Sequence, residues 1–86
     1  MLYKIKNVEL EAEYILLILF ADGTQKKYDI KPLFDKWPKF NDLKNISGLY
    51  DLVKVDPGGY GISSNDEIDL SADELYKNGN ENAKNA

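Results

Sequence analysis

The residue types that carry most protein chemistry are absent from this 86-residue sequence, which has neither a histidine nor a cysteine. Histidine is the commonest general base at neutral pH, and cysteine is the most readily activated nucleophile. Zinc sites also rely on these two residues in nearly every case. We therefore expect a protein that binds rather than an enzyme, with no catalytic residue, no metal ion and no cofactor.

One acidic stretch comes closest to a metal site. Asn65-Asp66-Glu67-Ile68-Asp69 offers several oxygen atoms of the kind that Ca²⁺ or Mg²⁺ prefers. The stretch lacks the alternating aspartates and the glycine of an EF-hand loop. Acidic residues also suit a turn and the approach to a helix N-terminus. We favour this structural interpretation over a cation site.

Two small motifs have equally ordinary explanations. Ser63-Ser64 supplies hydroxyl groups, but a serine nucleophile needs a base, and only lysines and carboxylates are available. Gly58-Gly59-Tyr60-Gly61 is similar to a fragment of a phosphate-binding loop, but it lacks a following Lys-Ser/Thr pair and opens no long helix. We interpret the first motif as strand and turn residues, and we predict a hairpin turn at the second.

Aromatic and acidic residues remain as candidates for binding a partner. Tryptophan and tyrosine supply much of the binding energy at protein interfaces. Trp37 stands between Lys36 and Pro38, and it is the residue that we most expect to be partly exposed. The candidate partner-binding residues are Trp37, Tyr60, Asp66, Glu67, Asp69, Asp73 and Tyr76.

The net charge of −4 is unevenly distributed along the chain. Residues 50–76 carry seven carboxylates against one lysine, whereas residues 24–44 carry six lysines against three carboxylates. We favour two solvated faces that pair loosely with each other, although an acidic face that meets a basic partner explains the same pattern. The chain has no arginine, which argues against sequence-specific recognition of nucleic acid.

The composition also bears on the compartment in which the protein works. The longest apolar run, from Tyr14 to Ala21, is too short to span a bilayer, and residues 1–6 lack the apolar core of a signal peptide. Small secreted domains often need disulfides, so a chain without cysteine favours a reducing compartment. We expect a cytoplasmic protein.

The spacing of apolar residues predicts an α+β domain that begins with a three-stranded meander. Residues 5–13 alternate between apolar and polar, as a half-buried strand does. Residues 14–20 are continuously apolar, which is typical of a central strand covered on both faces. Asp22-Gly23 predicts a hairpin, and the lysines of residues 24–30 suit an exposed edge strand.

Shorter elements are predicted after the meander. Helical turns are predicted over residues 32–35 and 41–46, and a hairpin from strands at 52–55 and 60–63. Ser71 and Glu74 have the spacing of a capping box, which predicts a helix that ends at Gly79. We thus expect one domain over residues 1–79, a small antiparallel sheet with a C-terminal α-helix, and a frayed polar tail over residues 80–86.

A spaced series of residues along nearly the whole chain resembles a known family. The series comprises Asp22-Gly23, residues 28–33, Phe40, Leu43, residues 53–56, Gly61-Ile62 and residues 66–76. It resembles the small prokaryotic family called domain of unknown function 2442. The resemblance implies a compact α+β domain with no established activity, found beside another small domain as the antitoxin of a toxin–antitoxin pair. Relatives commonly have a tryptophan where Ser64 stands, so a partner interface that uses it would differ here.

These observations lead to one main hypothesis and several alternatives. The main hypothesis is a protein-interaction module, an antitoxin-like binder of a small basic protein encoded nearby, with no membrane or nucleic-acid partner. The first alternative is an acidic inhibitor that mimics nucleic acid and blocks a nucleic-acid enzyme. A carboxylate-based metal enzyme and a DNA-binding domain through residues 26–44 remain open. The exposed edge strand at residues 24–30 also offers a site for pairing with a second copy of the chain.

Overall fold

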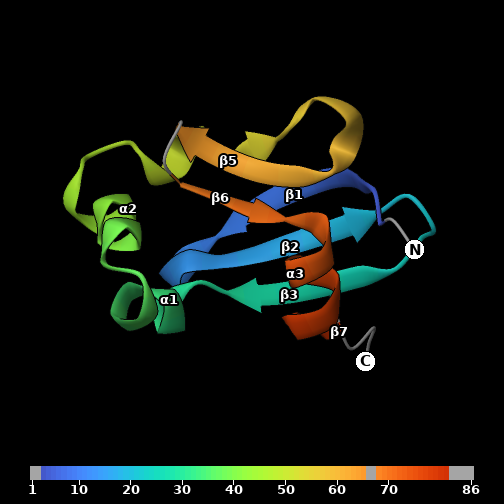
Figure 1. The fold of residues 1–86 in the computed structure, drawn as a ribbon, viewed down its shortest axis with the longest axis horizontal. Coiled ribbons are helices and arrows are strands. Elements are labelled where there is room, and N and C mark those ends of the chain that lie inside the picture. Colours follow the sequence, from blue (N-terminus) through green and yellow to red (C-terminus); the bar gives the residue numbers. More distant parts are fainter. Residues whose placement is uncertain (1–2, 66–67, 82–86) are drawn as a thin grey trace.

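The computed structural model describes residues 3–65 and 68–81, and it confirms the α+β class. The strands of this part form two antiparallel sheets rather than one (Figure 1). The first sheet has the order β1-β2-β3-β7, and the second has the order β4-β5-β6. The strands are β1 Ile5–Glu11, β2 Ile15–Phe20, β3 Gln25–Asp29, β4 Lys54–Val55, β5 Gly61–Asn65, β6 Ile68–Ser71 and β7 Asn80–Glu81.

The helices are short and lie mostly between the two sheets in sequence. They are α1 Lys31–Lys36, α2 Asp42–Asn45 and α3 Ala72–Asn78, and 3₁₀ turns span Ala12–Tyr14, Pro38–Asn41, Tyr50–Leu52 and Pro57–Gly59. The helix α1 ends at Lys36, and the backbone of the next residue, Trp37, is extended because a residue before proline disfavours helical angles. No helix among the described residues is long and apolar enough to cross a membrane.

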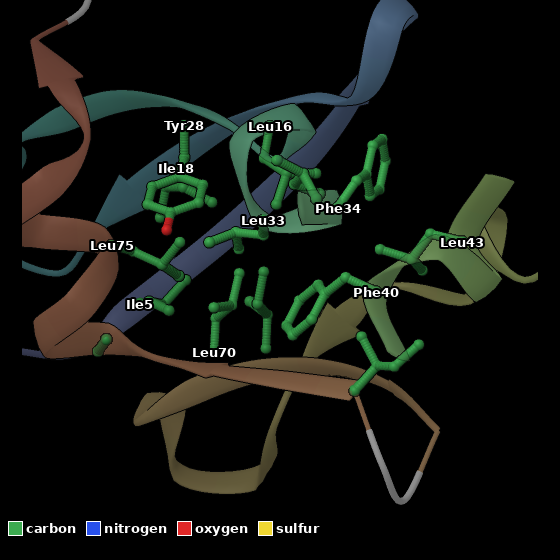
Figure 2. Close-up of a cluster of buried hydrophobic side chains, with 14 of the residues drawn as sticks. Ile5, Leu16, Ile18, Tyr28, Leu33, Phe34, Phe40, Leu43, Leu70 and Leu75 are labelled. Atoms are coloured by element: carbon green, nitrogen blue, oxygen red, sulfur yellow. The ribbon is translucent and has the colours of Figure 1, made fainter. Parts of the chain in front are cut away.

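The core lies on one face of the first sheet. Leu16, Ile18 and Phe20 alternate along β2 and are almost fully buried. Figure 2 shows Leu16 and Ile18 beside side chains from α1, β6 and α3, which all belong to the same buried cluster. The intervening residues of β2 are only half-buried. The prediction of a strand covered on both faces is therefore wrong for one face, whose side chains lie outside the core cluster.

The connection between β1 and β2 is a strained turn. Glu13 and Tyr14 both adopt positive φ angles, 63° and 62°, which are uncommon for residues other than glycine. The Tyr50 hydroxyl group lies 2.9 Å from the carbonyl oxygen of Glu11 and 3.2 Å from that of Ile15, donating to both. The Lys31 ammonium donates to the carbonyl oxygen of Glu13 at 2.7 Å. These contacts hold the turn, which ends β1 at residue 11 instead of residue 13.

The predicted cap of α3 is confirmed on one side only. The Ser71 hydroxyl accepts the backbone N–H of Glu74 at 3.1 Å, as a capping box requires. The Glu74 carboxylate, however, accepts a hydrogen bond from the Tyr28 hydroxyl at 2.8 Å. This second hydrogen bond joins α3 to β3 across the core. The Glu74 side chain therefore stabilises a contact between two elements instead of completing the capping box.

The end of α3 also differs from expectation. Gly79 follows the helix with φ −75°, not with the left-handed backbone of a glycine stop. A Cβ atom at Gly79 would lie 2.6 Å from the carbonyl oxygen of Leu75, so close backbone approach explains the glycine. The chain then forms β7, in which Asn80 and Glu81 pair with Lys27 and Lys26.

This pairing corrects two expectations. Residues 80 and 81 belong to the sheet instead of a frayed tail, and residues 82–86 lie outside the described part. The strand β3 is therefore covered by β7 over part of its length, so it is not a free edge throughout. The remaining exposed edge is shorter than the sequence suggests.

Candidate partner-binding site

A shallow hollow beside the start of α3 brings together two of the predicted binding residues, Tyr60 and Asp73. Its volume is about 320 Å³, and it is lined by Tyr3, Tyr60, Ser71, Ala72 and Asp73. Tyr60 is 51 % exposed, one of the most exposed large hydrophobic side chains in the described chain. A tyrosine ring and a carboxylate thus share one open surface.

The turn before Tyr60 fixes the position of its ring. Gly59 has φ 83°, and a Cβ atom there would lie 2.7 Å from the carbonyl oxygen of Ile5. Glycine therefore allows the turn to pass directly against β1. The carbonyl oxygen of Tyr60 accepts the backbone N–H of Ala72 at 2.8 Å. The turn is thereby fastened to the start of α3, and Tyr60 projects from a rigid support.

Tyr76, a third predicted binding residue, lies behind the hollow. Its ring stacks on Tyr3, with ring centroids 3.8 Å apart and planes 13° apart. It also packs edge-to-face against Phe20 at 4.9 Å. Its hydroxyl lies 3.4 Å from both Asp22 and Thr24, and the Lys26 ammonium lies 4.9 Å from its ring. Tyr76 thus holds Tyr3 in place and joins α3 to the hairpin after β2.

Trp37 and Asp69 meet in a second hollow of about 220 Å³, which Lys39 and Phe40 also line. The Trp37 side chain is 39 % exposed, as the sequence led us to expect. Its ring lies 5.8 Å from that of Phe40, and the Lys36 ammonium lies 4.8 Å from its centroid. The predicted residues therefore fall into two groups, while Asp66 and Glu67 lie outside the described residues.

The first hollow contains two groups that attract cations, and a lysine of the same chain already lies near one of them. Within the described residues, the Asp73 carboxylate makes no hydrogen bond or ion pair, and the ammonium of Lys4 lies 5.8 Å from the Tyr60 ring. Aromatic rings attract cations over their faces, and carboxylates form strong charge-assisted hydrogen bonds with them. The arrangement suits the side chain of a lysine or an arginine.

No pattern in the sequence pointed to Tyr3, which forms the third wall of this hollow. Tyr3 lies near Tyr60 because β1 passes beside the turn at residues 57–59. Local sequence patterns do not specify this contact. Sequence reasoning also missed a hollow of about 380 Å³ between the strained turn and the loop after α2, whose lining includes Tyr14, Ile46 and Tyr50. Burial raises the pKa of Tyr50 there to about 12.

Metal binding finds no support in the described residues. Across residues 3–65 and 68–81, no three acidic side chains converge closely enough to hold an ion. The acidic stretch that we considered for a cation includes Asp66 and Glu67, which lie outside this part.

A comparison with known protein families finds a match. The family described as "Protein of unknown function (DUF2442)" matches residues 5–81, which is most of the chain. No curated protein and no solved structure matches the chain.

Proposed function

The chain belongs to the DUF2442 family, whose function is unknown, and from this premise we propose that it is a protein-interaction module rather than an enzyme. Its partner binds in the hollow formed by Tyr3, Tyr60 and Asp73. The partner is a small basic protein encoded by a neighbouring gene, which the chain neutralises as an antitoxin does. The absence of cysteine from the sequence supports a reducing compartment such as the cytoplasm.

The observation that carries this proposal is the exposed Tyr60 ring on a rigid support, beside a carboxylate that has no partner among the described residues. Tyrosine is enriched among the residues that dominate binding energy at interfaces. The bond from Ala72 to the Tyr60 carbonyl holds the backbone that carries the ring, so little backbone entropy is lost on binding. Asp73 adds a negative charge within the same hollow.

The charge of the chain supports a basic partner. The net charge is −4, so the protein attracts cationic surfaces at long range. In the hollow, a lysine or arginine of the partner lies over the Tyr60 ring and pairs with Asp73. The second hollow, with Trp37 and Asp69, offers a further aromatic and acidic contact.

The test is co-expression with the product of the neighbouring gene, followed by purification of the complex and calorimetric titration. Tyr60→Ala is expected to weaken binding by about tenfold or more, and Asp73→Asn by a smaller factor. Asp35→Asn is the matched control, because Asp35 is exposed on α1 outside both hollows. A complex that tolerates both site variants would contradict the site, and no complex would contradict the function.

A nucleic-acid mimic is the alternative function, and it is favoured by the carboxylates of Asp69 and Asp73, which have no partner within residues 3–65 and 68–81. Such an inhibitor would bind a nucleic-acid enzyme mainly through charge, so raising the salt concentration would weaken binding steeply. In that case Asp69→Asn would weaken binding as much as Tyr60→Ala does. Binding that resists salt and depends on the Tyr60 ring would exclude the mimic.

A further inference from the structure

The outer face of the first sheet carries a column of three aliphatic side chains. Ile15, Leu17 and Leu19 alternate with the buried residues of β2 and are half-buried. They belong neither to the core cluster nor to the partly buried side chains that pack against it. An uninterrupted apolar strand is typical of burial on both faces. The strand therefore has the composition for a cover that the described residues do not supply.

The side chains that flank this column carry opposite charges at its centre. Leu17 pairs with Glu9 on β1 and with Lys27 on β3, so these three residues form one row across the sheet. Glu9 and Lys27 are both exposed. The neighbouring rows are Asn7–Leu19–Gln25 and Glu11–Ile15–Asp29. The central row therefore runs from an acid through an aliphatic residue to a base.

We propose that a second copy of this chain covers the face, related to the first by a twofold axis parallel to β2. Rotation about this axis places β1 of one copy over β3 of the other. Leu17 then meets Leu17 of the second copy, and each Glu9 faces a Lys27. A twofold axis perpendicular to β2 would instead set Glu9 against Glu9 and Lys27 against Lys27. The charges of the central row therefore favour the first arrangement.

The geometry of stacked sheets agrees with pairing at the central row. Sheets that pack face to face lie about 10 Å apart and cross at about 30°, so opposed side chains are closest near the axis. Glu11 and Asp29 of the outer row would face each other across the axis. Lys31 lies 3.0 Å from Asp29, and Lys27 lies 3.4 Å from Glu11 of its own chain, so Lys27 is shared between this Glu11 and Glu9 of the second copy.

The size of the face predicts weak association. Three strands and three rows cover roughly 300 Å² per copy at ordinary strand spacing. Stable interfaces bury about 800 Å² per partner. The dimer is therefore concentration-dependent, with a dissociation constant on the order of 0.1–1 mM.

Sedimentation of the full chain from about 20 µM to about 1 mM tests this, because that range brackets a weak dimer. The mean mass is expected to rise towards twice the monomer mass. Glu9→Lys and Lys27→Glu are each expected to remain monomeric, whereas an equal mixture of the two is expected to dimerise again. In the mixed dimer one charge pair is restored with reversed sign, and the other is the native pair between Glu9 of one chain and Lys27 of the other.

Controls separate this contact from other causes. Lys54→Glu changes the net charge as Lys27→Glu does, but it lies on β4 outside the face, so it is expected to dimerise like the wild type. In NMR spectra, the chemical shifts of the backbone amides of β2 and its neighbouring strands are expected to change with protein concentration. A wild-type chain that stays monomeric at about 1 mM would overturn the proposal. Single charge reversals that dimerise normally, or a mixture that does not recover, would also overturn it.

Variants of the face also distinguish a second copy of the chain from another protein as the molecule that covers it. If the wild type stays monomeric but Leu17→Asp loses the product of the neighbouring gene, that protein covers the face and the second copy is excluded. Tyr60→Ala is expected to leave dimerisation unchanged. The dimer and the partner-binding site can therefore be contradicted separately.

Discussion

The two faces of β2 carry the same kind of residue and have opposite environments. Leu16 and Ile18 on the inner face have no exposed surface, whereas Leu17 and Leu19 on the outer face remain half-buried. The inner face meets α1, α3 and the second sheet, and the outer face meets none of them. The comparison teaches that burial depends on what the rest of the chain places over each face, because alternation alone only separates the two sets of side chains.

The largest expected effect separates two adjacent leucines. Leu16→Ala is expected to lower the free energy of unfolding by about 2–5 kcal/mol, because it removes a buried side chain and leaves a cavity. Leu17→Ala is expected to cost about 1 kcal/mol or less, because its side chain is already partly in water. Urea unfolding at low protein concentration, where the chain is monomeric, measures both. Equal costs would show that the outer face is covered within the chain.

A smaller effect distinguishes two adjacent residues of β3. Tyr28 faces inward opposite Leu16, and its hydroxyl donates to Glu74. Tyr28→Phe leaves that carboxylate without its hydrogen-bond donor and is expected to lower the free energy of unfolding by about 1–2 kcal/mol. Lys27→Ala on the outer face breaks an exposed ion pair with Glu11 and is expected to cost about 0.5 kcal/mol or less. If Lys27→Ala proves the costlier change in urea unfolding, the contrast between the faces is wrong for β3.

Alkaline pH is expected to act on the tyrosines of the buried side. Burial raises the pKa of Tyr50 from 10.0 to about 12, and burial and the bond to Glu74 raise the pKa of Tyr28 as well. The unfolded state therefore loses these protons first, so the contribution of the two tyrosines to stability is constant below about pH 9 and falls from about pH 10 upwards. The urea midpoint as a function of pH measures this fall.

The matched variants for this pH prediction are Tyr50→Phe and Tyr60→Phe. Tyr50→Phe is expected to flatten the fall between about pH 10 and 12, since it removes one of the shifted groups. Tyr60 is half exposed, and its hydroxyl makes no hydrogen bond within the described chain, so Tyr60→Phe is expected to leave the profile unchanged. A profile that depends equally on both hydroxyls would contradict the assignment.

The smallest effect concerns a defect in the packing of the inner side. The Ser64 hydroxyl is buried and has no hydrogen-bond partner in the described part of the chain, and the residue lines a small void together with Leu16 and Phe40. Ser64→Ala is expected to leave stability unchanged or raise it by up to about 1 kcal/mol, because an unpaired buried hydroxyl is costly. Ser47→Ala, at an exposed position, is the control in thermal unfolding. A clear loss of stability in Ser64→Ala would show that the hydroxyl is satisfied, for example by a buried water.

Local signals in the sequence predicted the parts of the fold that depend on neighbouring residues. The Asp22-Gly23 hairpin forms between β2 and β3, and the backbone N–H of Thr24 bonds to the Asp22 carboxylate at 2.9 Å. This bond lowers the pKa of Asp22. The Ser71 cap forms as predicted. In each case the partners lie within three residues, so spacing alone specifies the contact.

Contacts over long sequence distances could not be predicted in this way. The strand β6 was missed because its pairing with β5 decides its conformation, and residues 68–71 look like the approach to a helix. The reciprocal half of the capping box failed because Tyr28, 46 residues away, binds the Glu74 carboxylate instead. The candidate site also depends on contacts between distant segments. Tyr60 and Asp73 were predicted as binding residues from the sequence, but Tyr3 was not.

The sequence by itself determined the class of this protein and the chemistry that it lacks. Without histidine or cysteine, the usual bases, nucleophiles and zinc ligands are absent whatever the fold. The apolar alternation and the turn residues determined the main strands and the last helix. Only the tertiary structure decided which face of β2 is covered and which aromatic residues share a hollow. Those outcomes depend on packing between segments far apart in the chain, which local periodicity does not encode.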